Sequence, residues 1–164
     1  WETRAPQFAS LADRTTVILL VRPQADVLES YFNDEMSSGG HSELTQEHAD
    51  QYAKSNMKMS VLNFYNTYKF TKNKFSRVLV VHHDELLSVA GAQNVVKRVN
   101  DFANGTYTLA LPTQVAYANT ATTINARHGG KQRACLSSGV RAEVMEHYLH
   151  FNIQLYKETG VWLE

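Results

Sequence analysis

The stretch that decides the fold is Thr16-Val-Ile-Leu-Leu-Val-Arg-Pro-Gln-Ala-Asp-Val-Leu-Glu-Ser-Tyr-Phe32, in which an apolar run ends at an arginine and a proline. Residues 17–21 form a continuous β-branched and leucine-rich run, which is typical of a parallel strand covered on both faces. Pro23 fits the first turn of a helix, where its missing N–H costs nothing. The apolar residues that follow recur at helical spacing and are expected to face the sheet: Val27, Leu28, Tyr31 and Phe32. We therefore expect a strand, a turn and a helix.

Arg22 and Ser30 lie eight residues apart, on either side of this turn. Parallel α/β sheets bind ligands outside the carboxyl ends of their strands. A cation at the strand end and a hydroxyl two turns into the helix can therefore converge on one phosphate. Taken alone, such a pair is more often a surface arginine and a solvent-exposed serine. In this setting, a nucleotide-phosphate site is the leading hypothesis.

Length and composition limit the number of domains and the classes of function that remain possible. With 164 residues and 43% hydrophobic content, the chain is expected to form a single domain, residues 1–164, around one core. Sixteen basic residues balance sixteen acidic ones, so the net charge predicts no general attraction to nucleic acid or to an anionic membrane. No apolar stretch approaches the roughly 20 residues that span a bilayer, and the N-terminus lacks the pattern of a signal peptide. We expect a soluble chain with no membrane segment.

The rest of the chain contains further periodic segments. We expect a loop over 34–42, one long helix from Gln46 to about Tyr68 capped by Thr45, a buried strand over 78–81, a helix over 92–103 and a last helix capped by Ser137 or Ser138. The basic run Lys69-Phe-Thr-Lys-Asn-Lys74 fits a solvated helix end better than a site for an acidic acceptor. The segment 107–136 has no clear period and predicts irregular structure.

His82-His-Asp-Glu85 follows the second strand and offers four polar groups in a row. Neighbouring residues of a strand point to opposite faces, and no further Cys or His supplies the spacing of a metal site. We therefore expect no metal. Asp84 is expected to cap the helix that begins at Leu86, and one of the histidines is expected to line a cleft.

Arg127-His-Gly-Gly-Lys-Gln-Arg133 concentrates three cations around two glycines. Glycines permit close backbone approach to a ligand, and amides beside Lys and Arg can form an anion-binding concavity. Taken alone, the run fits a basic surface loop equally well. Cys135 is the single cysteine, so it forms no disulfide within the chain. Asn104-Gly-Thr106 matches a glycosylation sequon, which fits a secretory lumen.

The segment Val21-Arg-Pro-Gln-Ala-Asp-Val-Leu-Glu-Ser30 resembles the 3′-phosphate-binding segment of sulfotransferases that use 3′-phosphoadenosine-5′-phosphosulfate (PAPS). Other segments follow in the order of that family, and the likeness is greatest to Golgi carbohydrate sulfotransferases of the heparan sulfate type. The resembling segments are Arg4-Ala-Pro-Gln-Phe8, Arg77-Val-Leu-Val-Val-His-His-Asp-Glu-Leu-Leu87, Phe102-Ala-Asn-Gly105, Lys131-Gln-Arg-Ala134 and the closing helix Tyr148-Leu-His-Phe-Asn-Ile-Gln-Leu-Tyr-Lys-Glu-Thr-Gly160. In the fourth of these, Gln132 stands where glycine is usual.

The resemblance implies a three-layer fold like that of P-loop NTPases, an α/β architecture with a parallel central sheet. It implies that Arg22 and Ser30 hold the 3′-phosphate of PAPS. Gly130, Lys131 and Arg133 would complete that pocket, while Arg4 would contact an acidic acceptor or the sulfo group. The implied reaction transfers a sulfuryl group from PAPS to a hydroxyl or amine of a carbohydrate or another acceptor, without a metal.

The family's phosphosulfate-binding loop, of Pro-Lys-Ser/Thr-Gly-Thr type, does not occur in the 164 residues. The resemblance therefore covers the C-terminal two-thirds of such a domain, with a fold incomplete at the N-terminus. The catalytic base remains open among Glu2, His82 and His83. Two alternatives stay open as well: a non-catalytic scaffold or interaction subunit derived from a sulfotransferase, and a P-loop kinase-like phosphotransferase. The Golgi lumen or another secretory compartment is the expected location, with the cytoplasm as the alternative.

Overall fold

The computed structural model describes residues 15–38, 44–102 and 133–164, which group into two compact units. The sheet unit holds the described residues of 15–22, 63–102 and 151–163. The helical unit holds those of 23–62 and 133–150, together with Glu164. The prediction that the whole chain forms one domain stays a prediction, and each unit is described separately.

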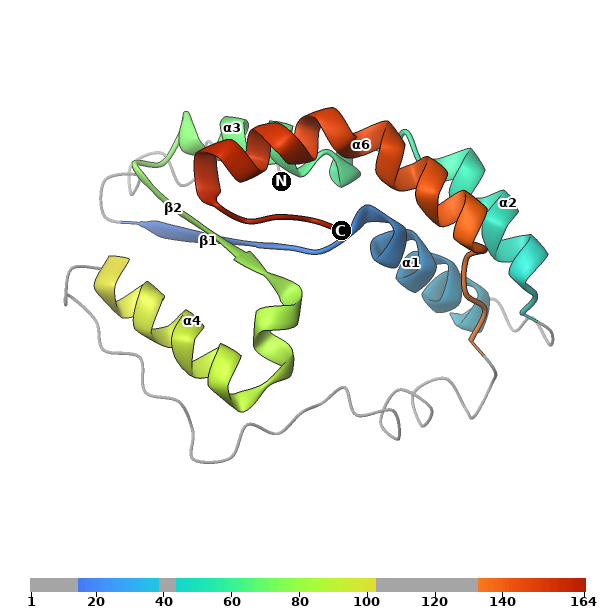
Figure 1. Ribbon diagram of the computed structural model, residues 1–164, viewed down its shortest axis with the longest axis horizontal. Helices are drawn as coiled ribbons and strands as arrows, with labels where there is room; N and C mark the ends of the chain where they lie inside the picture. Colours follow the sequence, from blue (N-terminus) through green and yellow to red (C-terminus); the bar gives the residue numbers. More distant parts are fainter. Residues whose placement is uncertain (1–14, 39–43, 103–132) are drawn as a thin grey trace. The chain divides into compact units, whose positions relative to one another are not determined.

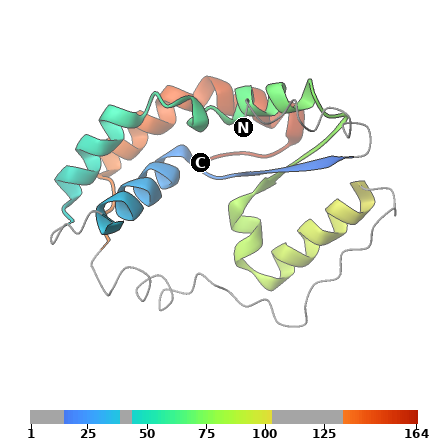
Figure 2. The ribbon, with the colours of Figure 1, turned by 180° about the vertical axis from the view of Figure 1, so that it is seen from behind.

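The sheet unit contains two parallel strands, β1 (Thr16–Val21) and β2 (Arg77–His82). They pair in register from Thr16 with Arg77 to Val21 with His82, and they run side by side in Figures 1 and 2. Both predicted strands are therefore confirmed, each extended by a residue or two. Parallel strands flanked by helices confirm the mixed α/β class.

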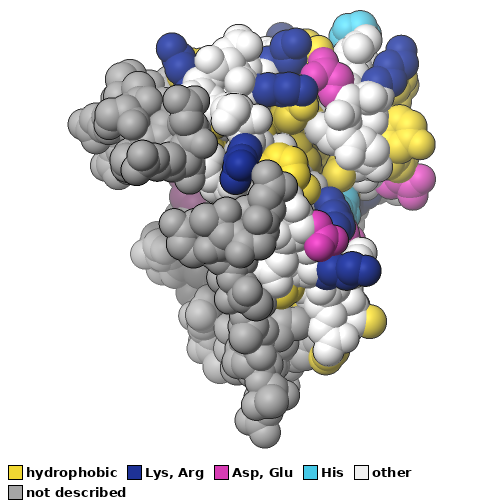
Figure 3. Space-filling view, turned by 90° about the vertical axis from the view of Figure 1, so that its left-hand side faces the viewer, with side chains coloured by type: hydrophobic (Ala, Val, Ile, Leu, Met, Phe, Trp, Pro, Cys, Tyr) yellow, Lys and Arg dark blue, Asp and Glu magenta, His cyan; other side chains and the backbone are white. Residues whose placement is uncertain are grey.

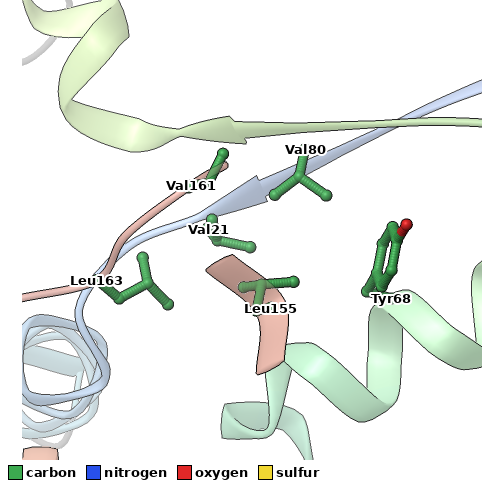
Figure 4. Close-up of a cluster of buried hydrophobic side chains, with 6 residues drawn as sticks. All are labelled: Val21, Tyr68, Val80, Leu155, Val161 and Leu163. Carbon is green, nitrogen blue, oxygen red and sulfur yellow. The ribbon is translucent and has the colours of Figure 1, made fainter. Parts of the chain in front are cut away.

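One face of this sheet is covered by α3 (Phe64–Lys72) and by the last turns of α6 (Ser138–Thr159) with the chain that follows them. Six side chains from these segments and from both strands form an apolar cluster (Figure 4): Val21, Tyr68, Val80, Leu155, Val161 and Leu163. Leu155 is completely buried. This cluster joins segments that lie more than a hundred residues apart in the sequence.

The opposite face is covered by α4 (Val89–Phe102), whose Val95 and Val99 pack against Val81 of β2. The register places Ile18 and Leu20 of β1 on the same face as Leu79 and Val81, because paired residues of parallel strands share a face. Ile18 is 46% exposed and Leu20 is 48% exposed. The predicted two-sided cover of the first strand is therefore wrong among the described residues, since α4 covers β2 and leaves β1 open.

The helical unit packs α1 (Gln24–Ser38) against α2 (Gln46–Asn56), with Phe32 and Tyr52 in ring contact at 5.6 Å. Val27, Leu28 and Phe32 are buried, whereas Tyr31 is 38% exposed and does not belong to the buried stripe. That this stripe faces the sheet stays a prediction, because α1 and the sheet belong to different units. The carbonyl of Pro23 accepts from the amides of Asp26 and Val27, so Pro23 lies at the N-cap of α1 and closes its first turn, as predicted. The predicted loop over 34–42 begins too early, because α1 continues to Ser38.

The single helix predicted over 46–68 is wrong. Thr45 caps its start as predicted, but α2 ends at Asn56, a 3-10 turn covers Ser60–Leu62, and α3 begins at Phe64. Asn63 caps α3 by accepting from the amide of Asn66 at 3.0 Å. In the helical unit, the Tyr148 hydroxyl donates to the Met57 carbonyl and Gln24 donates to the Leu62 carbonyl at 3.3 Å. These partners satisfy carbonyls that an unbroken helix would have bonded internally.

The remaining helices follow their predictions more closely. α4 begins at Val89, three residues earlier than predicted, after a 3-10 helix, η3 (His83–Leu87). The Ser137 side chain accepts from the Val140 amide at 3.3 Å, which confirms one of the two predicted caps of α6. Most of the predicted stripe of α6 is buried, namely Val140, Val144, Tyr148 and Leu155, whereas Phe151 is only partly buried. Among the described residues, no helix is long and apolar enough to span a membrane.

Candidate functional site

Arg22 directly follows β1 and is partly buried. It therefore occupies the strand end that the sequence predicted, at the carboxyl edge of a parallel sheet. No described residue forms a side-chain hydrogen bond or ion pair with its guanidinium. Arg22 belongs to the sheet unit and Ser30 to the helical unit, so their convergence on one phosphate stays a prediction.

Ser30 lies two turns into α1 and is partly buried. Asp26, one turn before it, and Glu29, its neighbour, both bind the guanidinium of Arg141 on α6. Burial acts to lower the pKa of Arg141, but the hydrogen bonds that its guanidinium donates to Asp26 and Glu29 outweigh this effect and raise that pKa above its ordinary value. A permanent cation therefore holds the two carboxylates of this helix next to Ser30. This role of Arg141 was not predictable from the sequence, because nothing in its local pattern sets it apart from a surface residue of a helix.

Arg133 is exposed, and the chain directly after it is attached to α1. The Ala134 amide donates to Asn33 Oδ1 at 3.0 Å, and Asn33 Nδ2 donates to the Ala134 carbonyl at 2.9 Å. The Leu136 amide donates to Glu29 Oε1 at 2.9 Å. Glu29 and Asn33 flank Ser30 along the helix, so the structure brings the end of the predicted basic loop to the helix of Ser30.

Asn33 is the residue that makes this attachment, and it is only 1% exposed. Its amide offers a donor and an acceptor at once, which matches the carbonyl and the amide of one backbone residue. A polar residue within an apolar helical stripe is the signal that could have drawn attention to it. The other residues predicted for the site, Arg4, Gly130 and Lys131, lie outside the described residues.

At the end of β2, the predicted cap by Asp84 is wrong. The imidazole Nδ1 of His82 accepts from the Asp84 amide at 3.2 Å, while Glu85 Oε1 accepts from the His82 amide at 3.0 Å. This reciprocal pair forms a capping box for η3, which follows the strand without a linker, so the last strand residue becomes the cap. In the part of the chain that the structure describes, no group of three His, Cys, Asp or Glu residues is arranged to hold a metal ion.

Two of the three candidate bases lie in this turn. His82 and His83 are both partly buried, and Glu2 lies outside the described residues. His82 Nδ1 already accepts the capping bond, so in a neutral imidazole the proton is on Nε2. His83 Nδ1 lies 3.3 Å from Asp84 Oδ1. His83 is therefore the histidine of this turn whose ring is oriented by a carboxylate.

The basic run at the end of α3 pairs within the sheet unit. Lys69 and Lys72 lie 3.7 and 4.0 Å from the Glu158 carboxylate, and both side chains are about half exposed. On the face drawn in Figure 3, acidic side chains lie among the basic ones. This arrangement agrees with the predicted solvated helix end. Cys135 is exposed and has a free thiol.

Comparison with known proteins identifies no relative of this chain. The chain matches no protein-family model, and no significant match was found among curated proteins or solved structures.

Proposed function

We propose that this chain forms the 3′-phosphate end of a PAPS site in a sulfotransferase with a three-layer, P-loop-NTPase-like fold. The observation that carries the proposal is the hydrogen-bonded attachment of Ala134 to Asn33. It supports a clamp in which Arg133 and Ser30, distant in sequence, face the same ligand. The resemblance of the ordered segments to PAPS-dependent sulfotransferases supplies the identity of that ligand.

In the proposed site, Arg22 neutralises the 3′-phosphate and Ser30 donates a hydroxyl hydrogen bond to it. Arg133 adds a second cation, with Lys131 and Gly130 in the same loop. Arginine suits this task because its planar fork donates two hydrogen bonds to a phosphate. Arg141 supports the site indirectly, because it binds Asp26 and Glu29, whose charges would otherwise repel an anion at Ser30.

The proposed reaction transfers a sulfuryl group to a hydroxyl or amine, with a carbohydrate as the favoured acceptor class. The acceptor atom attacks sulfur, the bond between sulfur and the bridging phosphate oxygen breaks, and 3′-phosphoadenosine-5′-phosphate leaves. A base takes the acceptor proton, and His83 is the better oriented of the two described candidates. By analogy with phosphoryl transfer, the protein contributes positioning and charge neutralisation.

Calorimetric titration of the chain with 3′-phosphoadenosine-5′-phosphate tests the proposal, with adenosine-5′-phosphate as the probe that lacks only the 3′-phosphate. We expect the first nucleotide to bind at least about tenfold more tightly, as charge-assisted hydrogen bonds predict. Arg22→Ala and Arg133→Ala should each remove most of this preference. Lys58→Ala, which removes an exposed cation of the helical unit, is the matched control and should leave it unchanged.

Equal affinity for the two nucleotides would overturn the assignment. So would an Arg22→Ala chain that keeps the preference of the wild type. Nucleotide binding without sulfuryl transfer, in a protein that carries a phosphosulfate loop, would favour the non-catalytic scaffold. Activity that depends on magnesium and is lost with EDTA would favour the kinase-like alternative.

A further inference from the structure

A pocket of about 510 Å³ lies in the sheet unit, beyond the carboxyl end of β2. Three segments line it: the turn after β2, the helix α4 and the chain that follows α6. The lining residues are His82, Asp84, Glu85, Arg98, Thr159, Gly160, Val161 and Trp162. The carboxyl edge of a parallel sheet is where α/β proteins place ligands. None of these residues belongs to the proposed nucleotide clamp.

The wall formed by Glu85 and Arg98 is held by several hydrogen bonds. Arg98 Nη1 donates to Glu85 Oε2, and Arg98 Nη2 donates to the Val80 carbonyl at 3.0 Å. Glu85 also accepts from the His82 amide at 3.0 Å. The guanidinium is thus paired with a carboxylate and bonded to the backbone. Its charge is neutralised within the wall, so Arg98 does not make the pocket an anion site.

The opposite wall is shaped by the end of α6. Gly160 has a φ of 73°, in the left-handed region, and its amide donates to the Tyr156 carbonyl at 2.7 Å. A residue of this conformation ends a helix and reverses the chain. The Thr159 hydroxyl accepts from the Val161 amide at 3.2 Å and fixes the next step of the chain. This turn carries Trp162 to the pocket, with its ring 5.7 Å from that of Tyr156 in an edge contact.

Two exposed groups of the lining can contact a ligand. The Asp84 side chain is 62% exposed, and its carboxylate oxygens lie 3.9 Å from His82 Nδ1 and 3.3 Å from His83 Nδ1. Trp162 is 38% exposed although it is a large aromatic residue. With histidines counted as neutral, the lining contains two carboxylates and one guanidinium, which leaves one net negative charge. A pocket lined by both an indole and a carboxylate offers the two kinds of group that attract organic ammonium compounds.

We propose that this pocket binds a small organic cation, with the ammonium group at Asp84 and the apolar part against Trp162. The proposal goes beyond the nucleotide site and shares no residue with the nucleotide clamp, although Asp84 also contacts His83, the preferred base of the proposed reaction. Its chemical class follows from the net charge of the lining and from the neutralised guanidinium. A ligand with a carboxylate or phosphate in place of the ammonium group would be repelled by the Asp84 carboxylate and should bind more weakly.

Benzylamine is the probe, with benzyl alcohol and benzoate as neutral and anionic controls of similar size. In a Trp1→Phe background Trp162 is the sole tryptophan, so its fluorescence reports binding. We expect a saturable change with benzylamine at millimolar concentration, binding at least about tenfold weaker with benzyl alcohol, and none with benzoate. Added salt should weaken benzylamine binding, because the ammonium–carboxylate attraction is partly screened.

Asp84→Asn should weaken benzylamine binding about tenfold or more. This change keeps the backbone amide that donates to His82, so the capping box is retained. Asp101→Asn, on the exposed surface of α4, is the matched control and should bind as the parent does. Circular dichroism and the thermal midpoint confirm that each variant is folded. The proposal is overturned if benzoate binds as well as benzylamine, or if folded Asp84→Asn and the parent bind benzylamine equally.

Discussion

The two units of this chain join distant segments in different ways. In the sheet unit, a paired backbone ladder and an apolar cluster bring β1, β2, α3 and α6 together. In the helical unit, side-chain amides of α1 make hydrogen bonds to the backbone of segments that lie outside the α-helices and strands. Gln24 bonds to Leu62, and Asn33 bonds to Ala134, which lies 101 residues away in the sequence.

This difference follows from what each unit must bury. The ladder between β1 and β2 pairs backbone amides and carbonyls with one another, so the side chains that cover this sheet can be largely apolar, although the Val80 carbonyl also accepts from Arg98. The chain around residues 57–62, which includes the 3-10 turn, and the chain around 133–137 have no strand partner, and their buried polar groups need other partners. Gln24 and Asn33, which are 0% and 1% exposed, provide them. The proposed nucleotide clamp depends on this second kind of junction.

Removing apolar volume from the sheet unit should have the largest effect on stability. Leu155 is 0% exposed within the apolar cluster, so Leu155→Ala leaves a cavity. We expect a loss of about 3 kcal/mol in the free energy of unfolding, measured by chemical denaturation. Leu149→Ala removes the same atoms from the same helix at a position that is 46% exposed. It should change stability by less than about 0.5 kcal/mol, and equal losses would contradict the core assignment.

Removing the Asn33 side chain, which attaches Ala134 to α1, should lower the stability less and act more locally. Asn33→Ala leaves the amide and carbonyl of Ala134 without their side-chain partner. We expect a loss of about 2 kcal/mol, because buried backbone groups would then lack hydrogen bonds. Hydrogen exchange at the Ala134 amide should accelerate, which distinguishes this junction from a general loss of stability.

Asn94→Ala is the control for that change, since Asn94 is an exposed asparagine within α4. It should leave the Ala134 amide protected. If exchange at Ala134 is the same in Asn33→Ala and in the wild type, the attachment of the basic loop to α1 is refuted. The proposed clamp would then lose the observation that carries it.

Hydrophobic periodicity predicted most of the sheet unit. The runs at 17–21 and 78–81 became paired strands, and Val95 and Val99 became the buried side of α4. These predictions succeeded because a strand or helix shows its buried face in its own sequence. The exposure of Ile18 and Leu20 was not predictable, since their run is typical of a strand covered on both faces, whereas among the described residues α4 packs against β2.

The helical unit and the sites were harder to predict, because their determinants are distant in sequence. The break after Asn56 is stabilised by Tyr148 and Gln24, and neither residue is visible in a local window. His82 caps η3 although histidine is not a usual cap, so the preferred residue Asp84 was chosen instead. Arg98 and Trp162 reach the pocket from separate segments. The strand ends were predictable, whereas the partners that shape a site around them were not.

Removing the hydroxyl of Tyr148, which bonds to the chain at the break between α2 and α3, should have the smallest effect on the free energy of unfolding. It donates to the Met57 carbonyl and lies 3.3 Å from the Met59 carbonyl. Tyr148→Phe keeps the ring and removes only this donor, so we expect a loss of about 1 kcal/mol near pH 7. Burial raises the pKa of Tyr148 above its ordinary value of 10.0.

That shift fixes the sign of a pH dependence. Because the pKa is raised in the folded state, the unfolded chain releases the Tyr148 proton at a lower pH than the folded chain. The stability that the protonated hydroxyl contributes is therefore present below pH 10 and is lost as the pH rises through the folded-state pKa. The free energies of unfolding of the wild type and of Tyr148→Phe should therefore converge as the pH rises above 10, when both are measured by denaturation at matched ionic strength. Tyr156→Phe, at an exposed position of the same helix, is the control and should match the wild type at neutral pH. If the difference in free energy of unfolding between the wild type and Tyr148→Phe stays constant or widens above pH 10, the Tyr148 hydroxyl does not bond to the carbonyls at the helix break in the folded protein.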